Sequence, residues 1–450
     1  MKRYLWGIVL VGLIGMEGLW AQINPGGYVQ TYNRLRLQQN GKYTWNENRL
    51  GLTWEGGVSD RLHFYSRLRL RAFGLPVVSR TADLQRREKD RVLPWTLEFR
   101  EAYIDVYDFL IPNLDIRIGR QRIAWGTGDG LNPTDNLNPD DLEDIFDFGR
   151  HVGSNAVSLQ YYLHDLTLQL VYIPVFTPAI LPFGDWADAF RTTLPVPGGV
   201  RIRSYQDTVR LPQNRLTHTS SFAVKISGML LGYDWSISYY QGRDDLPLLT
   251  SVTLMPTDNV GEFDLHAELT FPRFRVLGAD FAGEVRGVGL WAEAALFFPE
   301  KVYRQLRIVG LPPGVGRKTE LALGDRPYLK FVIGGDYTFR NGWYVNAQYL
   351  HGFLHERGRE ELVDYFLLRL EKRTLNDALK IVPLGIALAI PDWNNVRQNY
   401  GIAGGPQIAY QPVDALEISL GAFIIQGKGD NLFSKVEQLD EGFFKVTYHF

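Results

Sequence analysis

The chain has 450 residues, of which 45% are hydrophobic and 22% are charged, with a formal net charge of −2 and no cysteine. This composition excludes a disordered chain and a disulfide-stapled domain, and the near-neutral charge gives no electrostatic reason to bind nucleic acid. Abundant aromatic residues (23 Tyr, 25 Phe and 11 Trp) accompany 45 Gly, a mixture typical of a β protein with many turns and aromatic girdles.

The first predicted element is a secretory signal peptide over residues 1–21. Lys2 and Arg3 precede an apolar stretch from Tyr4 to Met16, and Ala21 offers a cleavage point, although Leu19 is bulkier than the small residue preferred there. No later segment reaches the length of about 18 apolar residues that a membrane-spanning helix requires. We therefore expect residues 22–450 to be exported as one domain.

The remainder repeats one pattern, in which roughly ten alternating residues, a tight turn, a second alternating run and a longer loop follow one another. Eighteen segments are predicted as strands, at residues 27–39, 46–58, 62–74, 95–109, 114–126, 153–163, 166–176, 218–230, 233–243, 263–282, 288–299, 328–339, 343–354, 363–375, 378–390, 400–412, 415–426 and 442–450. The segment 263–282 could divide at Pro272, and the pattern fits 16 to 18 strands.

Loop length alternates along the chain. The long connections are predicted at residues 75–94, 127–152, 177–217, 244–260, 300–327 and 427–440, with tight turns between them. Outer-membrane barrels sort their loops in this way, with short periplasmic turns and long outer loops, whereas soluble sandwiches and propellers have no reason to do so. The sequence therefore predicts an all-β transmembrane antiparallel β-barrel, surrounded by the lipid of a Gram-negative outer membrane.

The alternation continues to the last residue of the chain. Phe444, Val446, Tyr448 and Phe450 alternate with polar residues up to the C-terminal carboxylate. An open strand edge cannot lie in hydrocarbon, so we expect this segment to pair with the strand near residue 30 and to close the barrel. The same four residues resemble the C-terminal signal that the barrel-assembly machinery reads. A buried edge strand of a soluble sandwich is the alternative interpretation.

One motif carries a resemblance to a known family. It consists of Arg120, Gln121, Trp125 and Gly126, followed by Asn132 and Pro133. The pattern R-Q-x-x-x-W-G and then N-P resembles an uncharacterised porin-like family of bacterial outer-membrane proteins, and residues 334–353 and 416–430 look similar too. The resemblance covers most of the mature chain. It implies a barrel in the outer membrane, and it implies no established substrate and no catalytic residues.

Arginines share one face of the first strands, opposite leucines. The predicted pore-lining residues are Arg34, Arg36, Arg49, Arg67, Arg69, Arg71, Arg100 and Arg117. An arginine on the lipid face costs roughly 2–4 kcal/mol at the midplane, so these side chains must face the lumen or lie near an interface. The alternation slips by one residue near Arg100 and near Gly119, which indicates bulges. A solvated or salt-bridged wall is the alternative, because Glu47, Glu55, Glu98 and Glu101 are close in sequence.

The loop that follows these strands is acidic. Its carboxylates are Asp129, Asp135, Asp140, Asp141, Glu143, Asp144 and Asp147, with Arg150 as the basic residue among them. Their spacing does not match an EF-hand loop, which gives little support to a calcium site. Two interpretations stay open: a solvated outer loop, or an inward-folded loop that constricts the pore. The Asn-Pro pairs that begin at residues 132 and 138 favour a compact course.

No motif of an enzyme occurs, since G-x-S-x-G, H-E-x-x-H and G-x-x-x-x-G-K-[ST] are all absent. His351 and His355 are interpreted as solvated residues near a rim rather than a metal site. We predict a passive porin or substrate-selective diffusion channel for small solutes or ions, without catalysis, cofactor or metal. The alternatives are a barrel that moves lipid or another hydrophobic solute, which would need an apolar interior or a lateral opening, an outer-membrane enzyme, and a structural or adhesive barrel. The solute, the pore radius and association into homotrimers are left open.

Overall fold

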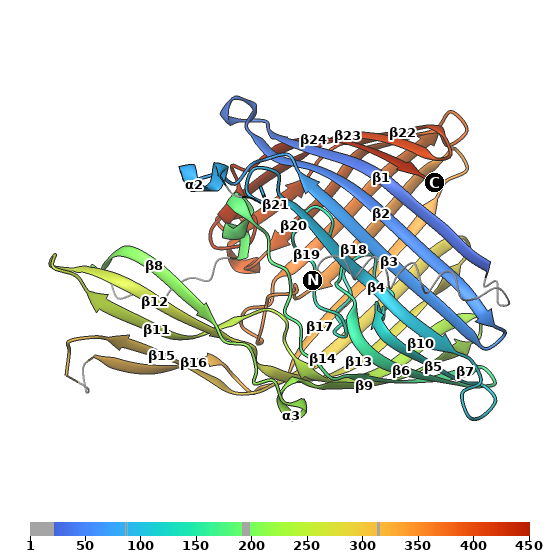
Figure 1. The fold of residues 1–450 in the computed structure, drawn as a ribbon, viewed down its shortest axis with the longest axis horizontal. Helices are drawn as coiled ribbons and strands as arrows, with labels where there is room; N and C mark the ends of the chain where they lie inside the picture. Colours follow the sequence, from blue (N-terminus) through green and yellow to red (C-terminus); the bar gives the residue numbers. More distant parts are fainter. Residues whose placement is uncertain (1–21, 86, 88, 191–198, 313–315) are drawn as a thin grey trace.

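The computed structural model describes residues 22–450, apart from residues 86, 88, 191–198 and 313–315, so the predicted signal peptide lies outside the described residues. The described residues form a closed antiparallel barrel of 18 strands, in which β21 and β22 are two halves of one interrupted strand (Figure 1). This confirms the predicted fold class and strand number.

The barrel strands are β1 (Gln22–Arg36), β2 (Tyr43–Ser59), β3 (Leu62–Phe73), β4 (Trp95–Val106), β5 (Leu114–Gln121), β6 (Ser154–Leu163), β7 (Leu166–Ile173), β9 (Ser221–Leu230), β10 (Tyr233–Arg243), β13 (Arg273–Val285), β14 (Val288–Pro299), β17 (Tyr328–Thr338), β18 (Trp343–His351), β19 (Asp364–Thr374), β20 (Leu379–Ile390), β21 (Tyr400–Gly404), β22 (Gln407–Val413), β23 (Leu416–Lys428) and β24 (Glu441–His449). Short helical turns lie in the connections: η1 (Gln39–Gly41), α2 (Thr81–Leu84), η2 (Gly184–Phe190), α3 (Leu216–Thr219), η3 (Trp393–Asn395) and η4 (Ser434–Val436).

Tight turns gather at one end of the barrel, together with the C-terminus (Figure 1). The turns after β6, β9 and β13 use left-handed backbone at His164 (φ 53°), Leu231 (φ 56°) and Arg286 (φ 54°). Left-handed residues match the twist of paired strands in such short hairpins. The long connections gather at the other end, which confirms the predicted sorting of loops.

The last strand closes the barrel against the first. β24 pairs with β1 from Tyr28 opposite His449 to Arg36 opposite Glu441. Beyond this ladder, the backbone N–H of Gly27 donates to the Phe450 carbonyl at 2.9 Å, and the Phe450 N–H donates to the Gly27 carbonyl at 3.0 Å. Phe444, Tyr448 and Phe450 point outward and are exposed. The predicted closure is therefore confirmed, while recognition by the assembly machinery stays a prediction.

Deleting Phe450 is expected to lower the amount of folded barrel in the outer membrane and to leave export across the inner membrane intact. The deletion removes the final pair of closing hydrogen bonds in a place where hydrocarbon offers no replacement. The measurement is the heat-modifiable fraction in isolated outer membranes, with Phe450→Tyr as the conservative control. Wild-type amounts of folded deletion variant would contradict the prediction.

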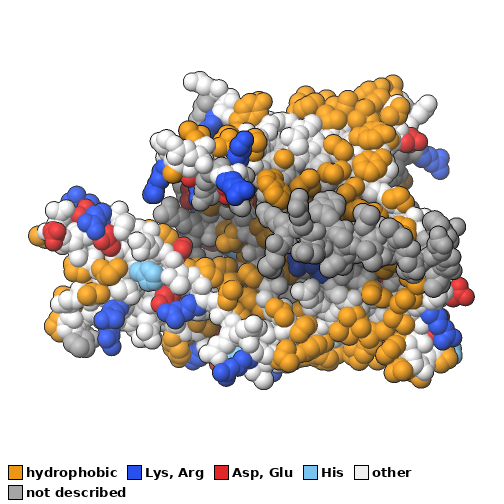
Figure 2. Space-filling view, in the orientation of Figure 1, with side chains coloured by type: hydrophobic (Ala, Val, Ile, Leu, Met, Phe, Trp, Pro, Cys, Tyr) orange, Lys and Arg blue, Asp and Glu red, His pale blue; other side chains and the backbone are white. Residues whose placement is uncertain are grey.

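Apolar side chains cover the outside of the barrel wall. Leu97, Phe99, Ile237, Ile333 and Leu420 are each more than half exposed on outward positions of four strands. Figure 2 shows hydrophobic side chains spread over the visible wall, with charged side chains collected toward its ends. A closed barrel with this exterior satisfies the requirement that every backbone group in hydrocarbon be paired. The protein is an outer-membrane barrel.

Among the described residues, none of the helices is both long enough and apolar enough to cross a bilayer.

A second sheet projects beyond the long-loop end of the barrel (Figure 1). Its strands, in spatial order, are β16 (Arg317–Leu323), β15 (Val302–Ile308), β11 (Leu248–Pro256), β12 (Glu262–Thr270) and β8 (Arg201–Val209). Leu249, Val252, Leu254, Leu265 and Ala267 form its small buried core. The sequence analysis assigned most of these residues to loops, which is wrong.

The predicted strand 263–282 divides, as Pro272 allowed. β12 belongs to the projecting sheet and β13 to the barrel, with Phe271 and Pro272 at the junction. Proline has no N–H to donate to a ladder, so a strand ends readily beside it.

Candidate functional site

Residues 122–153, which we name the crossing loop, connect β5 to β6 and pass through the barrel interior. The loop begins with a local brace, in which Asn138 accepts a hydrogen bond from the Ile123 N–H at 2.7 Å and donates one to the Gln121 carbonyl at 3.0 Å. It then contacts β18 and β4, which are diametrically opposite in the order of paired strands. The inward course that the sequence analysis considered is therefore the one this structure has.

A single glutamate on β14 anchors one side of the crossing loop. The Glu293 carboxylate accepts hydrogen bonds from the N–H groups of Thr127 (2.9 Å), Gly128 (3.2 Å) and Thr134 (2.7 Å), and from the Thr134 hydroxyl (2.8 Å). Gly126 has φ +90°, and a Cβ atom there would lie 2.4 Å from Glu293 Oε2. Sequence analysis missed Glu293. The sequence feature that could have indicated it is that Glu293 is the one charged residue on the inward face of β14.

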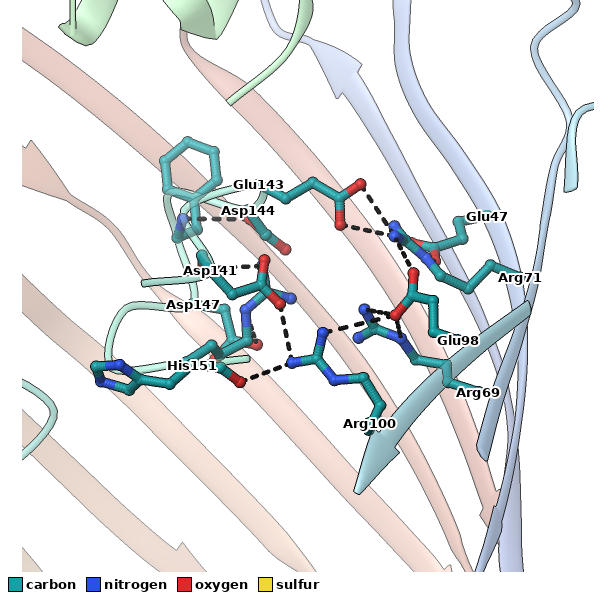
Figure 3. Close-up of polar contacts among 12 residues, drawn as sticks. Glu47, Arg69, Arg71, Glu98, Arg100, Asp141, Glu143, Asp144, Asp147 and His151 are labelled. Atoms are coloured by element: carbon teal, nitrogen blue, oxygen red, sulfur yellow. Dashed lines mark hydrogen bonds and ion pairs between the residues drawn. The ribbon is translucent and has the colours of Figure 1, made fainter. Parts of the chain in front are cut away.

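Opposite this anchor, loop carboxylates meet arginines of the first strands (Figure 3). Glu143 lies 2.7 Å from Arg71 on β3, and Asp141 lies 3.0 Å from Arg100 on β4. Asp144 lies 3.3 Å from Arg34 on β1. Three of the predicted carboxylates thus lie against predicted arginines.

The other four predicted carboxylates have different surroundings. Asp129 accepts a hydrogen bond from Asn346 on β18 at 3.1 Å, on the far wall. Asp135 pairs with Arg122 inside the loop, Asp140 lies 3.4 Å from His151, and Asp147 lies 3.6 Å from Arg150. The last three contacts brace the loop itself, and the contact of Asp129 joins the loop to β18 rather than to the arginines of the first strands.

Burial and neighbouring charge set the ionisation of the loop carboxylates. Burial alone would raise the pKa of Asp141, but the guanidinium groups of Arg150 and Arg100 outweigh it and hold that pKa below its usual value. Burial and the nearby Asp245 carboxylate raise the pKa of Asp140 well above its usual value. The ionised form is therefore favoured at Asp141, beside two arginines, and disfavoured at Asp140, beside another carboxylate.

Several predicted pore-lining arginines are buried in ion pairs. Arg34 and Arg36 are each 1% exposed and lie near Glu441 on β24, at 3.6 and 3.1 Å. Arg71 is 3% exposed and contacts Glu47 as well as Glu143. These contacts match the salt-bridged wall that was the alternative for this face, and they fasten the crossing loop.

Other arginines line a cavity of about 360 Å³ between the first strands and the crossing loop. The arginines around it are Arg49, Arg67, Arg69, Arg100, Arg122 and Arg150, together with the carboxylates of Glu101 and Asp147. Arg117 does not line the cavity and pairs with Asp105 at 2.6 Å. Sequence analysis did not propose Arg122 or Arg150 as lining residues, because their contribution depends on the inward course of the loop.

The predicted bulge at Arg100 is confirmed, since the pairing of β3 and β4 shifts between Arg67 and Leu68, opposite that residue. The predicted bulge at Gly119 is wrong, because β5 pairs with both neighbours without a shift there. Gly119 instead has φ +134°, and a Cβ atom would lie 2.3 Å from the Ala102 carbonyl oxygen.

The opposite side of the crossing loop is apolar, which the sequence analysis did not predict. Phe146 of the loop stacks on Phe423 of β23 with ring centroids 3.7 Å apart. Leu131, Ile145 and further loop residues pack with inward side chains of β17 to β23. The crossing loop therefore divides the interior into a charged side and an apolar side.

Within the described part of the chain, no group of three or more His, Cys, Asp or Glu residues could hold a metal ion. His351 lies 2.6 Å from Asp364.

Comparison with known proteins gives likeness only among solved structures. No family model and no curated protein matches the chain, so the family resemblance of the motif is not confirmed beyond the barrel fold. Salmonella typhi OmpF in complex with daunomycin is similar at 10% identity and a TM-score of 0.40, over 95% of this chain and 97% of that one. The trimer form of in-vitro folded Vibrio cholerae OmpT is similar at 9% identity and a TM-score of 0.42, over 95% and 99% of the two chains.

Proposed function

We propose that the barrel is a passive diffusion channel of the outer membrane that favours small anionic solutes and ions, with the crossing loop as its constriction. The observation that carries the proposal is the cavity on the charged side, where six arginines surround a space with two carboxylates. Clustered charge of one sign between low-dielectric walls concentrates counter-ions and raises their rate of entry.

The ion pairs between loop and strands give the constriction its rigidity. Opposite charges about 4 Å apart attract by about 4 kcal/mol at an effective dielectric constant near 20. Three such contacts join Arg34, Arg71 and Arg100 on three strands to the short stretch of the loop from Asp141 to Asp144. The opposite wall holds the loop through Glu293. A constriction fixed on two walls keeps its radius while solutes pass.

Refolded protein in a planar bilayer tests the proposal through its reversal potential in a KCl gradient. We expect the wild type to prefer chloride, and Arg67→Gln with Arg69→Gln to shift selectivity toward potassium, because both side chains line the cavity. The shift should shrink as salt rises, since the screening length is about 10 Å at 0.1 M. Arg117→Gln, outside the cavity, is the matched control.

Wild-type channels with no anion preference, or a double variant with unchanged selectivity at low salt, would contradict the charged route. Absence of any conductance would favour the structural or adhesive barrel. Association into homotrimers stays a prediction, which the mass of the detergent-solubilised protein would check.

A further inference from the structure

The barrel wall contains a defect on its apolar side, between β20 and the interrupted strand β21–β22. Val382 pairs with Gln407 and Ile386 pairs with Gly404, so that β20 advances four residues while its partner advances three. The extra residue is a β-bulge that includes Pro383, and Pro406 lies opposite it. Two prolines remove two ladder donors from one place in the wall.

At this defect, which we call the seam, glycines let the backbone of the interrupted strand lie in close contact with β20 and β23. A Cβ atom at Gly404 would lie 2.0 Å from the Gly385 carbonyl oxygen, and one at Gly405 would lie 2.1 Å from the Ala422 carbonyl oxygen. Besides the ladder pairs on either side, one backbone hydrogen bond runs from the Gly405 N–H to the Gly385 carbonyl of β20 and one from the Ala422 N–H of β23 to the Pro406 carbonyl, both at 3.0 Å. Fewer bonds hold these strands together than hold an uninterrupted antiparallel pair.

The defect lies within the lipid-facing belt rather than at a rim. Outward side chains on either side of it, Ile402 and Ile408 on the interrupted strand and Leu420 and Ile424 on β23, are apolar and exposed. A weakened ladder in hydrocarbon is costly, because lipid cannot replace the missing partners. Bulges in barrels recur where a wall serves a purpose other than closure.

A cavity of about 390 Å³ adjoins the defect, and its lining residues occupy both inward and outward positions of the wall. Its inner lining includes Phe146, Leu367 and Phe423, whose side chains face the lumen. Its outer lining includes Leu368, Ile386 and Ala422, which alternate with them or lie on the lipid side of β20. Gly404, Gly405 and Pro406 lie between the two sets.

We propose that this cavity is a lateral portal, through which an uncharged and predominantly apolar small molecule passes between the lumen and the membrane. Aromatic and aliphatic side chains offer such a molecule contacts beside the crossing loop, and apolar side chains cover the lipid face beyond the seam. The charged members of the lining have polar partners, since Arg369 pairs with Glu371 at 3.2 Å and Asp129 accepts a hydrogen bond from Asn346, which also lines the cavity. The portal is independent of the charged route on the other side of the crossing loop.

Entry of the apolar dye N-phenyl-1-naphthylamine into intact cells tests the portal, because the dye fluoresces only after reaching hydrocarbon and an intact outer leaflet excludes it. We expect cells that carry the wild-type barrel to admit the dye faster than cells without it. Ala422→Trp should block the outer mouth and reduce entry to the level of cells without the barrel. Ala279→Trp, on an outward position of β13 far from the portal, should leave entry unchanged.

Both tryptophans lie on the lipid face, and heat-modifiability verifies that each variant is folded. Wild-type entry with Ala422→Trp, or no difference between cells with and without the wild-type barrel, would overturn the portal. Chloride preference in planar bilayers should be the same in all three proteins. Dye entry therefore tests the portal and chloride preference tests the charged channel, so that either proposal can be contradicted without the other.

A reversible disulfide across the seam repeats the test within one variant. The chain has no cysteine, so Ala387→Cys combined with Ala403→Cys creates a single pair across the seam, at paired residues that both line the cavity. Antiparallel partners have Cα atoms about 4.5–5.5 Å apart, a separation that a disulfide spans. Oxidation should abolish dye entry and reduction should restore it. The matched pair Ala279→Cys with Ala294→Cys, on the uninterrupted β13–β14 ladder, should have no effect. Undiminished entry with the disulfide formed would overturn the proposal.

Discussion

Replacing Glu293 by glutamine should raise the single-channel conductance and make the open level noisier. The carboxylate accepts four hydrogen bonds from the crossing loop, and an amide keeps only one acceptor oxygen while its NH2 group faces donors. Each lost hydrogen bond to a charged group removes about 1.5–3 kcal/mol. The segment from Thr127 to Thr134 would then lose its attachment to β14, while the ion pairs with β1, β3 and β4 and the bonds of Asp129 to β18 would remain.

Planar-bilayer recordings at fixed salt measure this effect, with Glu417→Gln as the control. Glu417 is on β23, where it accepts a hydrogen bond from Ser419 at 2.8 Å and does not line the crossing loop. Conductance and noise identical to the wild type in Glu293→Gln would show that the loop keeps its course without this anchor. The constriction would then rest on the ion pairs of the opposite wall.

Glu47→Gln should destabilise the folded barrel by about 3–5 kcal/mol, the range for removing one partner of a buried ion pair. Glu47 is fully buried, lies 2.7 Å from Arg49, contacts Arg71 and accepts a hydrogen bond from the Trp45 indole at 2.9 Å. Neutralising it leaves two buried guanidinium groups with less compensating charge. Reversible urea unfolding of the refolded barrel measures the change in the free energy of unfolding.

Glu55→Gln supplies the comparison on the same strand, because Glu55 is exposed. Exposed substitutions of this kind change the free energy of unfolding by less than about 0.5 kcal/mol. Equal midpoints for the two variants would mean that water reaches the Glu47 cluster and replaces the lost charge. Salt dependence of the wild-type midpoint would separate that case from a dry ion-pair network.

The barrel could be predicted from the sequence because its wall has one simple rule. A strand between lipid and lumen alternates with period two, so Leu35 and Leu37 point outward while Arg34 and Arg36 point inward, as the structure shows. Each hairpin also joins strands that are adjacent in sequence, so that the pairing partner of a strand can be predicted from its neighbour along the chain. The bounds of β10 and β14 were therefore predicted to the residue, whereas β18 ends three residues before its predicted end.

The projecting sheet escaped prediction because its assembly depends on pairings between separate connections, although β11 with β12 and β15 with β16 form local antiparallel pairs. β8 pairs in parallel with β12, and β11 pairs in parallel with β15, so the partners are distant in sequence. β8 is exposed along nearly its whole length, and its sequence carries no steady apolar face. Such a segment is specified by its neighbours in space, which periodicity does not reveal.

The candidate site was predictable in composition but not in detail. The alternation of the first strands predicted that the arginines share one face, and the composition of the following loop predicted a group of carboxylates that could pair with them. The partner of each carboxylate depends on the course of the loop, which is set by Asn138, whose side chain braces the start of the loop, and by Glu293 on a strand far away in sequence. The division into Arg34 as a buried clamp and Arg67 as a cavity-lining residue follows only from that course.

The projecting sheet also constrains the order in which the chain can fold. Its five strands come from three separate connections, those between β7 and β9, β10 and β13, and β14 and β17. Because β15 must reach β11 and β8 must reach β12, the sheet is incomplete until the third connection has crossed the membrane. Long-range pairing of this kind is slow, since loop closure precedes any gain from contacts. The outer sheet is therefore expected to mature after the wall beneath it, as a late kinetic phase.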